Sequence, residues 1–154
     1  MRLGMKALIV YKSIHHGNTK KVAEAMAQAV GADLIELDQA TYDKVAEYDL
    51  VGFGSGIYKM KPHAMLLDFI DAAPPIPTKA FIFSTNGSLQ AMASRFLAPL
   101  KKALQAKGFE VVGEFSCPGW DTFGPLAWIG GYNRGRPNEA DLEKARSFAK
   151  GLVQ

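Results

Sequence analysis

The sequence predicts a doubly wound α/β domain, in which helices cover both faces of a five-stranded parallel sheet. Three observations predict this fold: runs of consecutive apolar residues, amphipathic segments between them, and a length of 154 residues that suits one domain. Strands that are apolar on both faces are typical of parallel sheets buried between helices. Their alternation with helices indicates right-handed crossovers from one strand to the next.

Five short apolar runs are the expected strands, and helical patterns separate them. The runs are Lys6–Tyr11, Leu34–Leu37, Leu50–Ser55, Ala80–Ser84 and Val111–Phe115. Helices are expected from about Thr19 to Val30, near Asp43–Tyr48, and in three later segments. The apolar faces of those three are Met65, Leu66, Phe69 and Ile70; Phe96, Leu97, Leu100 and Leu104; and Leu142, Ala145, Phe148, Ala149 and Leu152.

Two helix ends carry capping signals. Gly31 suits the C-cap of the first helix, because glycine readily adopts the left-handed conformation that ends many helices. Asn138 is expected at the N-cap of the last helix, directly after Pro137. Glu139 and Asp141 then fall in its first turn, where negative charge is favoured.

Composition excludes several classes of protein. Apolar residues make up 48% of the chain, but no apolar run approaches the roughly 20 residues that span a bilayer. The net charge is +3, yet Lys and Arg are scattered rather than interleaved with aromatic residues, so nucleic acid is not an expected partner. The single cysteine, Cys117, excludes an intrachain disulfide and fits a cytoplasmic protein. Residues 1–154 are expected to form one domain without a linker or repeat.

The segment between the first strand and the first helix predicts an anion site. It reads Lys12-Ser13-Ile14-His15-His16-Gly17-Asn18-Thr19. A helix N-terminus presents unpaired N–H groups and partial positive charge, and a glycine lets those amides close around a phosphate. Ser13, Asn18 and Thr19 can add side-chain donors. A capped turn without a ligand is the structural alternative.

The three histidines do not predict a metal site. His15 and His16 are adjacent, so their side chains point apart on most backbones, and no carboxylate or cysteine cluster joins them. One of the two is expected near the phosphate, which would favour its protonated form. His63 is expected in the first turn of a helix, with no assigned function.

Two other nucleotide-binding signatures are absent. A P-loop requires GxxxxGK[ST], which the sequence does not contain, and a dinucleotide fingerprint requires GxGxxG in a turn where only Gly17 is present. Gly52 and Gly54 belong to the third expected strand. Close packing of that strand explains them better than a phosphate loop does.

The order of strand, SxxxGNT loop and helix resembles the flavodoxin family. That family's phosphate loop reads roughly [ST]-x-T-G-x-T, and Ser13, Gly17 and Thr19 match its ends in a loop one residue longer. The resemblance covers almost the whole chain. It implies the strand order 2-1-3-4-5, FMN as the cofactor, and an FMN phosphate held by residues 13–19.

The resemblance also implies flavin contacts in three later loops. These residues are Gly56, Ile57, Tyr58 and Lys59 after the third strand, Thr85, Asn86 and Gly87 after the fourth, and Trp120 after the fifth. Tyr58 would stack on the isoalloxazine ring, and the Asn86 loop would offer backbone amides to its pyrimidine edge. The long irregular stretch Cys117–Pro137 is expected either to fold over the cofactor or to form a partner surface, and Trp120 is our own candidate for a wall of the pocket. The structural alternatives are a half-buried loop tyrosine at Tyr58 and an exposed turn at Asn86 and Gly87.

Two departures from the family pattern bear on the redox chemistry. Many flavodoxins have a glycine after the stacking aromatic residue, whereas Lys59 stands there in this chain. A Cβ makes a positive φ costly, which argues against a stabilised one-electron-reduced flavin. Flavodoxins are usually acidic, but this chain carries a net charge of +3. A nearby cation would stabilise an anionic reduced flavin, so we expect a less reducing flavin than a typical acidic flavodoxin has.

These features predict an FMN-containing electron-transfer protein. It would act as a monomer or homodimer, exchange electrons with redox partner proteins or small redox substrates, and need no catalytic side chain. The alternative is an NAD(P)H- or quinone-linked FMN reductase, with walls from Pro118–Arg136 and a phosphate contact from Arg134 or Arg136. A receiver domain is disfavoured, because Lys12-Ser13 and Gly54-Ser55 stand where it needs acidic residues. The intact phosphate loop disfavours a flavin-free scaffold.

Overall fold

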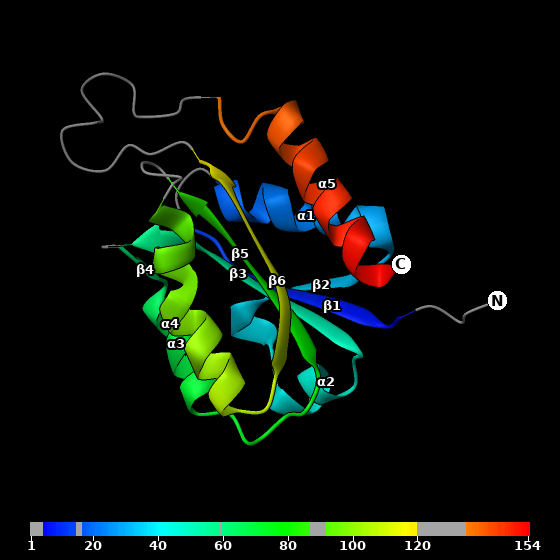
Figure 1. Ribbon diagram of the computed structural model, residues 1–154, viewed down its shortest axis with the longest axis vertical. Helices are drawn as coiled ribbons and strands as arrows, with labels where there is room; N and C mark the ends of the chain where they lie inside the picture. Colours follow the sequence, from blue (N-terminus) through cyan, green and yellow to red (C-terminus); the bar gives the residue numbers. More distant parts are fainter. Residues whose placement is uncertain (1–4, 15–16, 59, 87–91, 120–134) are drawn as a thin grey trace.

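The computed structural model describes residues 5–14, 17–58, 60–86, 92–119 and 135–154. Within them, five parallel strands form one sheet, to which a two-residue antiparallel strand is added (Figure 1). The strands are β1 (Ala7–Lys12), β2 (Asp33–Glu36), β3 (Leu50–Tyr58), β4 (Lys61–Pro62), β5 (Lys79–Asn86) and β6 (Glu110–Pro118). The order β2-β1-β3-β5-β6 confirms the expected 2-1-3-4-5 arrangement of the parallel strands.

Strand β4 is the element that the sequence did not predict. It pairs with the end of β3, with Ile57 opposite Pro62 and Tyr58 opposite Lys61. Two residues are too few to produce a periodic pattern, so this hairpin leaves no signal in the residue order.

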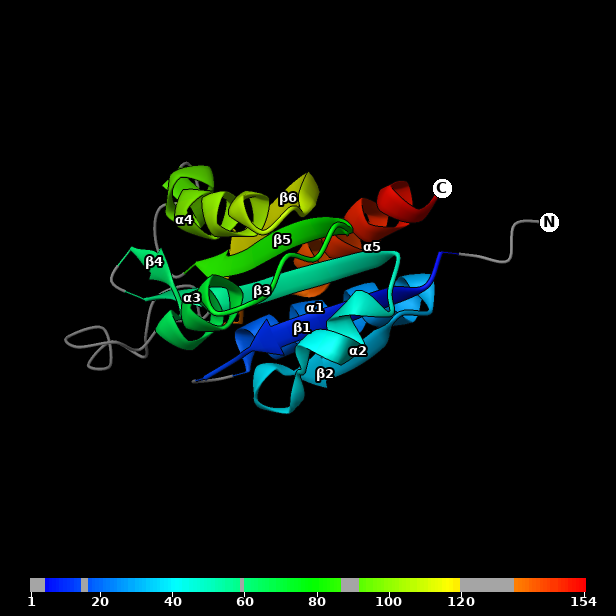
Figure 2. The same cartoon turned by 90° about the horizontal axis from the view of Figure 1, so that it is seen from below.

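Helices cover both faces of the sheet. Helices α1 (Asn18–Val30) and α5 (Glu139–Val153) lie side by side on one face. Helices α2 (Tyr42–Ala46), α3 (Ala64–Asp71) and α4 (Ala93–Ala106) pack on the other, as Figures 1 and 2 show. A single 3-10 turn (Leu37–Gln39) follows β2. In the described part of the chain, no helix combines the length and apolarity needed to cross a bilayer.

The two faces of the sheet build two hydrophobic cores. In β1, Leu8 and Val10 belong to the core under α2–α4, while Ile9 belongs to the core under α1 and α5. All three side chains are fully buried. Because both faces exclude water, the strand cannot alternate apolar with polar residues, and this explains its continuous apolar run.

The helix ends follow the expected capping pattern. Gly31 has φ 68° at the C-cap of α1, where its N–H donates to the Ala27 carbonyl. The Asn138 side chain accepts from the Asp141 N–H at 2.9 Å, and the Asp141 carboxylate accepts from the Asn138 N–H at 2.8 Å. This reciprocal capping box begins α5. The second helix is shorter than expected and ends before Tyr48.

Gly52 and Gly54 let two phenyl rings lie against strand β3. A Cβ on Gly52 would lie 2.2 Å from the Phe81 ring, and a Cβ on Gly54 would lie 2.2 Å from the Phe83 ring. Both rings are buried in the core under α1 and α5. Close packing of the strand therefore explains both glycines, as the sequence predicted.

We expect Gly54→Ala to lower the free energy of unfolding by about 1–3 kcal/mol, because its Cβ would overpack the buried Phe83 ring. Urea denaturation measures this change. Gly151→Ala in α5 is the control, since a Cβ there would meet nothing within 4 Å. The control should raise the free energy of unfolding by up to about 1 kcal/mol. Equal destabilisation by the two substitutions would contradict the packing explanation.

Candidate functional site

The candidate site lies at the carboxyl ends of the parallel strands, where the ends of β3, β5 and β6 lie next to the loop after β1 and the start of α1. Ligands of open α/β sheets bind at this edge, where the strand order reverses. Strand β1 has β2 on one side and β3 on the other, so the reversal falls at β1. The loop after β1 and the start of α1 therefore stand at the expected binding position.

The strands extend further than their apolar runs. Gly56, Ile57 and Tyr58 lie within β3, and Thr85 and Asn86 lie within β5. The expectation that Asn86 forms part of an exposed turn is therefore wrong. Its side chain is buried, it pairs with Pro118 of β6, and its carbonyl accepts from the Gly119 N–H at 3.1 Å.

The start of α1 has the backbone geometry of an anion site. Gly17 is its N-cap, with φ 66° and ψ 27°, and offers no side-chain cap. The Ser13 hydroxyl instead accepts from the Lys20 N–H at 3.3 Å. No acidic residue lies in the first turn of α1, so no carboxylate offsets the positive end of the helix dipole. These features suit a bound phosphate.

Thr19 fixes this helix start to the sheet. Its side chain is 1% exposed, and its hydroxyl oxygen lies 2.8 Å from the hydroxyl oxygen of Thr85 at the end of β5. One hydroxyl of the pair donates, and the one that accepts keeps its own proton for another acceptor. The pair therefore joins two of the expected site residues and still has a donor for an oxygen nearby.

Gly119, which directly follows β6, lies against Asn18 at the start of α1. A Cβ on Gly119 would lie 2.7 Å from the Asn18 side-chain nitrogen. Only a residue without a Cβ lets the Asn18 side chain occupy this position. Nothing in the residue order singles out Gly119, because its contact partner lies about a hundred residues earlier in the chain.

Tyr58 reaches from the end of β3 towards the loop after β1. Burial raises the pKa of Tyr58, and hydrogen bonds with the backbone of Ile14 and Gly56 oppose that rise. A Cβ on Gly56 would lie 2.7 Å from the Tyr58 hydroxyl oxygen. The half-buried tyrosine thus lies next to the candidate phosphate loop.

The His63 ring packs against the Tyr58 ring. The two rings meet edge to face, with centroids 5.2 Å apart. His63 is the N-cap of α3, so the expectation that it lies in the first turn is wrong by one position. Its Nδ1 accepts from the Met65 N–H at 3.0 Å, which places the proton of the neutral ring on Nε2. Its backbone N–H donates to the Ser55 hydroxyl at 3.1 Å.

The charges of Lys12 and Asp38 act on His63. Lys12 Nζ lies 3.2 Å from Asp38 Oδ1, and the lysine side chain is only 12% exposed. Burial lowers the pKa of His63, the Lys12 charge lowers it further, and Asp38 partly opposes both effects. Burial and the Lys12 charge therefore both favour the neutral form of His63.

Arg136 is engaged within the chain. Its guanidinium forms a bidentate pair with Asp141, with Nε–Oδ2 and Nη2–Oδ1 distances of 2.5 and 2.7 Å. Asp141 is 4% exposed and also belongs to the capping box of α5. The sequence analysis placed Asp141 in the first helical turn but missed this pair. Burial raises the pKa of the Cys117 thiol to about 12, in keeping with a buried structural residue.

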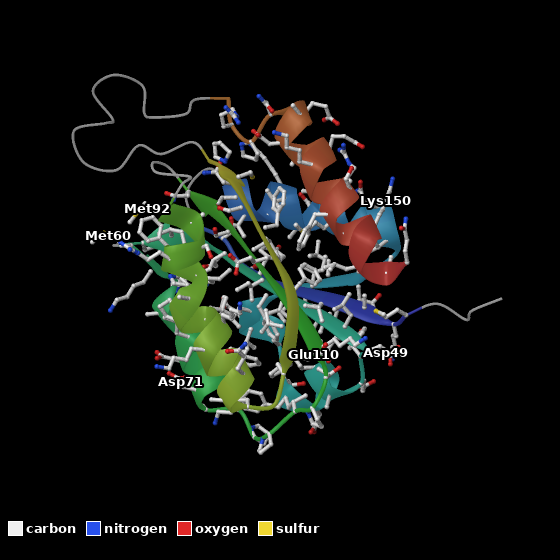
Figure 3. The ribbon with its side chains drawn as sticks, viewed as in Figure 1. Asp49, Met60, Asp71, Met92, Glu110 and Lys150 are labelled. Atoms are coloured by element: carbon white, nitrogen blue, oxygen red, sulfur yellow. The ribbon has the colours of Figure 1, made fainter. Side chains whose placement is uncertain are left out.

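Several expected site residues lie outside the described residues: His15, His16, Lys59, Gly87 and Trp120, together with Arg134. The described ranges contain no group of three His, Cys, Asp or Glu side chains that could hold a metal ion. A hollow at the opposite edge of the sheet is lined by Asp49 and Glu110, among others (Figure 3). Its carboxylates make it a poor site for a phosphate.

A doubly wound sheet with a glycine-opened helix start at its switch point defines the class of flavodoxin-like α/β proteins. The family model described as a flavodoxin domain matches residues 8–117. The chain belongs to this flavodoxin domain family.

The chain is similar to three known proteins. An uncharacterized protein of Methanocaldococcus jannaschii is 46% identical over 150 residues, which cover 97% of this chain and 99% of the relative. A flavodoxin from the domain Archaea has a TM-score of 0.70 at 20% identity, covering 96% of each chain. A flavoprotein of Lactobacillus acidophilus in complex with FMN has a TM-score of 0.57 at 19% identity, covering 73% of this chain and 93% of that one. At these identities the two solved structures show the shared fold.

We expect Asp141→Asn to lower the free energy of unfolding by about 1–3 kcal/mol at neutral pH, because Arg136 loses its charged partner and the capping box weakens. Hydrogen bonds from Arg136 hold the pKa of Asp141 below its ordinary 3.8. The stabilisation is therefore complete above about pH 3.8 and is lost as the pH falls through the lower pKa of the folded state.

Urea denaturation of wild type and variant at neutral and strongly acidic pH tests this expectation. The difference between the two proteins should shrink at acidic pH. Glu139→Gln is the control, because the Glu139 side chain is 78% exposed and its ion pair with Arg146 should contribute less than about 1 kcal/mol. A difference between wild type and Asp141→Asn that stays constant with pH would show that the Asp141 charge is not responsible.

Proposed function

We propose that this protein binds FMN and transfers electrons through it. The observation that carries the proposal is the start of α1: a left-handed glycine, an acid-free first turn and a Ser13 cap, all at the switch point of the sheet. Family membership supports a flavin at this edge, and the flavoprotein of Lactobacillus acidophilus in complex with FMN shares the fold.

The phosphate of FMN would be held by the amides at the start of α1. Ser13, Gly17, Asn18 and Thr19 would supply donors, together with the sequence-predicted His15 and His16. Each hydrogen bond to a charged phosphate is worth about 1.5–3 kcal/mol. Three or four such bonds and the helix dipole can hold a phosphate without an arginine.

The isoalloxazine ring would lie beside the ends of β3 and β5. Tyr58 and Ile57 supply ring and aliphatic surface from β3, and Thr85 and Asn86 supply polar groups from β5. Lys59, Gly87 and Trp120 remain part of the proposed pocket on the sequence pattern. The bound flavin supplies the redox chemistry, and the protein positions it and sets its potential.

The electron-carrier function is favoured over the NAD(P)H- or quinone-linked reductase. The reductase alternative assigned Arg134 or Arg136 to a phosphate of the substrate. The bidentate pair with Asp141 already engages the Arg136 guanidinium. We therefore propose redox proteins or small redox substrates as partners of a monomeric or homodimeric carrier. Steady-state oxidation of NAD(P)H by the FMN-loaded protein would favour the reductase instead.

We expect Gly17→Ala to weaken FMN binding by about 10- to 100-fold, because a Cβ at φ 66° distorts the amides that face the phosphate. The affinity for riboflavin should fall by less than about threefold, because riboflavin has no phosphate to bind these amides. Titration of flavin-free protein with each flavin, followed by quenching of flavin fluorescence, measures both affinities.

Gly31→Ala is the matched control for this experiment. Gly31 has φ 68° at the other end of the same helix, and a Cβ on either glycine would meet nothing within 4 Å. The two substitutions thus impose the same backbone strain, but only one lies at the proposed phosphate site. Equal losses of FMN affinity in both variants, or equal losses for FMN and riboflavin, would contradict the proposal.

A further inference from the structure

Three large apolar side chains are exposed in the described part of the chain: Ile14, Met60 and Met65, at 39%, 71% and 48%. Ile14 lies in the loop after β1, Met60 in the turn between β3 and β4, and Met65 in the first turn of α3. All three are therefore at the edge of the sheet that carries Tyr58 and the proposed flavin site. Methionine side chains are flexible and suit surfaces that adapt to a partner.

The backbone at Met60 points to a functional reason for this side chain. Met60 has φ 65°, a conformation that glycine adopts without strain and other residues adopt at a cost. The side chain is 71% exposed, so its burial cannot offset that cost. Such outliers persist where the residue is needed for something other than stability.

Positive charge adjoins this apolar surface. Strand β4, which carries the exposed Lys61, packs against α4. Arg95 and Lys102 are exposed on α4 and are seven residues apart, so they lie on one face of that helix. Helix α4 contains three basic residues, Arg95, Lys101 and Lys102, and no Asp or Glu. The neighbouring α3 carries Asp68 and Asp71, both towards its C-terminal end.

We propose that Met60, Met65, Lys61, Arg95 and Lys102 form a docking surface for an acidic electron-transfer protein. The inference rests on the proposed function, because it names the partner of the same redox site. Electron transfer requires the partner to approach the flavin, and Met60 is two residues from Tyr58. Figure 3 shows Met60 and Met92, the N-cap of α4, on the same side of the molecule. An acidic partner is complementary in charge and would be steered towards this surface.

Two other occupants fit the surface less well. A second copy of the chain would bring like charges together. Single-stranded nucleic acid binds through exposed aromatic rings as well as cations. In the part of the chain that the structure describes, the aromatic residue closest to Met60 in sequence is Tyr58, which is half-buried and hydrogen-bonded to Ile14 and Gly56.

A plant-type [2Fe–2S] ferredoxin, a small acidic protein of low reduction potential, is the probe for this surface. Stopped-flow mixing of reduced ferredoxin with the FMN-loaded protein follows the bleaching of flavin absorbance. Two reduced clusters each give up one electron, and FMN takes up both electrons together with one proton from the solvent, which gives the anionic hydroquinone. The second-order rate constant should fall about tenfold or more when NaCl rises from about 20 mM to about 500 mM.

Charge reversal tests which surface is used. Arg95→Glu with Lys102→Glu should lower the rate constant at low salt by about tenfold or more. Lys79→Glu with Lys150→Glu makes the same change in net charge at exposed positions away from the surface: the start of β5 and helix α5 (Figure 3). This control pair should change the rate constant by less than about threefold.

Met60→Gly separates docking from folding. The substitution removes both the exposed side chain and the backbone strain, so the urea midpoint should stay the same or rise. The affinity for ferredoxin should fall about three- to tenfold. A merely structural methionine would give the opposite result, with a lower midpoint and unchanged affinity.

The FMN content, read from the absorbance before mixing, tests the proposed function separately. A chain that retained no FMN would still be tested by surface plasmon resonance with oxidised ferredoxin. A rate or affinity that is insensitive to salt, or equal effects of the two charge-reversal pairs, would overturn the docking proposal. Tight binding of a labelled 20-nucleotide RNA that is lost in the Arg95→Glu, Lys102→Glu variant, without any effect on ferredoxin, would also overturn it.

Discussion

The hydrogen bond between Thr19 and Thr85 fixes the start of helix α1 relative to the sheet. The two hydroxyl oxygens lie 2.8 Å apart, and both side chains are buried. Separating a buried hydroxyl pair leaves polar groups unsatisfied in a low-dielectric interior, which is costly. The amides that follow Gly17 therefore keep a constant position beside the ends of β1 and β5. The proposed anion site would arise from this packing together with the helix dipole, and the described side chains need not supply a dedicated cation.

If backbone amides hold the phosphate, the positively charged side chains of the protein are available for another function. In the proposed account, backbone amides hold the phosphate, and the exposed cations of β4 and α4 surround the redox edge. The same positive field would stabilise the negative charge of a reduced flavin and attract an acidic partner. Both effects follow from one departure from the usual acidic flavodoxin surface, which the net charge of +3 already indicates. The expectation of a less reducing flavin and the docking proposal therefore share a physical cause.

The sequence predicted the sheet because strands buried on both faces must be apolar throughout. Ile9, Phe53 and Ile82 are fully buried, and each lies in one of the continuous apolar runs from which the strands were predicted. It missed the polar end of β5 beyond Ser84, because the Thr85 hydroxyl pairs with Thr19, which is distant in sequence. The position of Gly17 at the start of a helix was predictable, because it requires only that a helix follow the first strand. The packing of Gly119 on Asn18 depends on a tertiary contact that residue order does not reveal. The Arg136–Asp141 pair and the β4 hairpin are local, but each is too short to produce a periodic pattern.

The central claim is that backbone amides at the start of α1 bind the phosphate of FMN. Proton–nitrogen NMR spectra of the labelled protein test it most directly, because hydrogen bonding to a phosphate moves an amide proton resonance downfield. FMN should shift the amide resonances of Gly17, Asn18 and Thr19 strongly downfield, whereas riboflavin should leave them nearly unchanged. The account would be contradicted if FMN left these resonances in place, or if it instead shifted the amides around Asp49 and Glu110 at the opposite edge of the sheet.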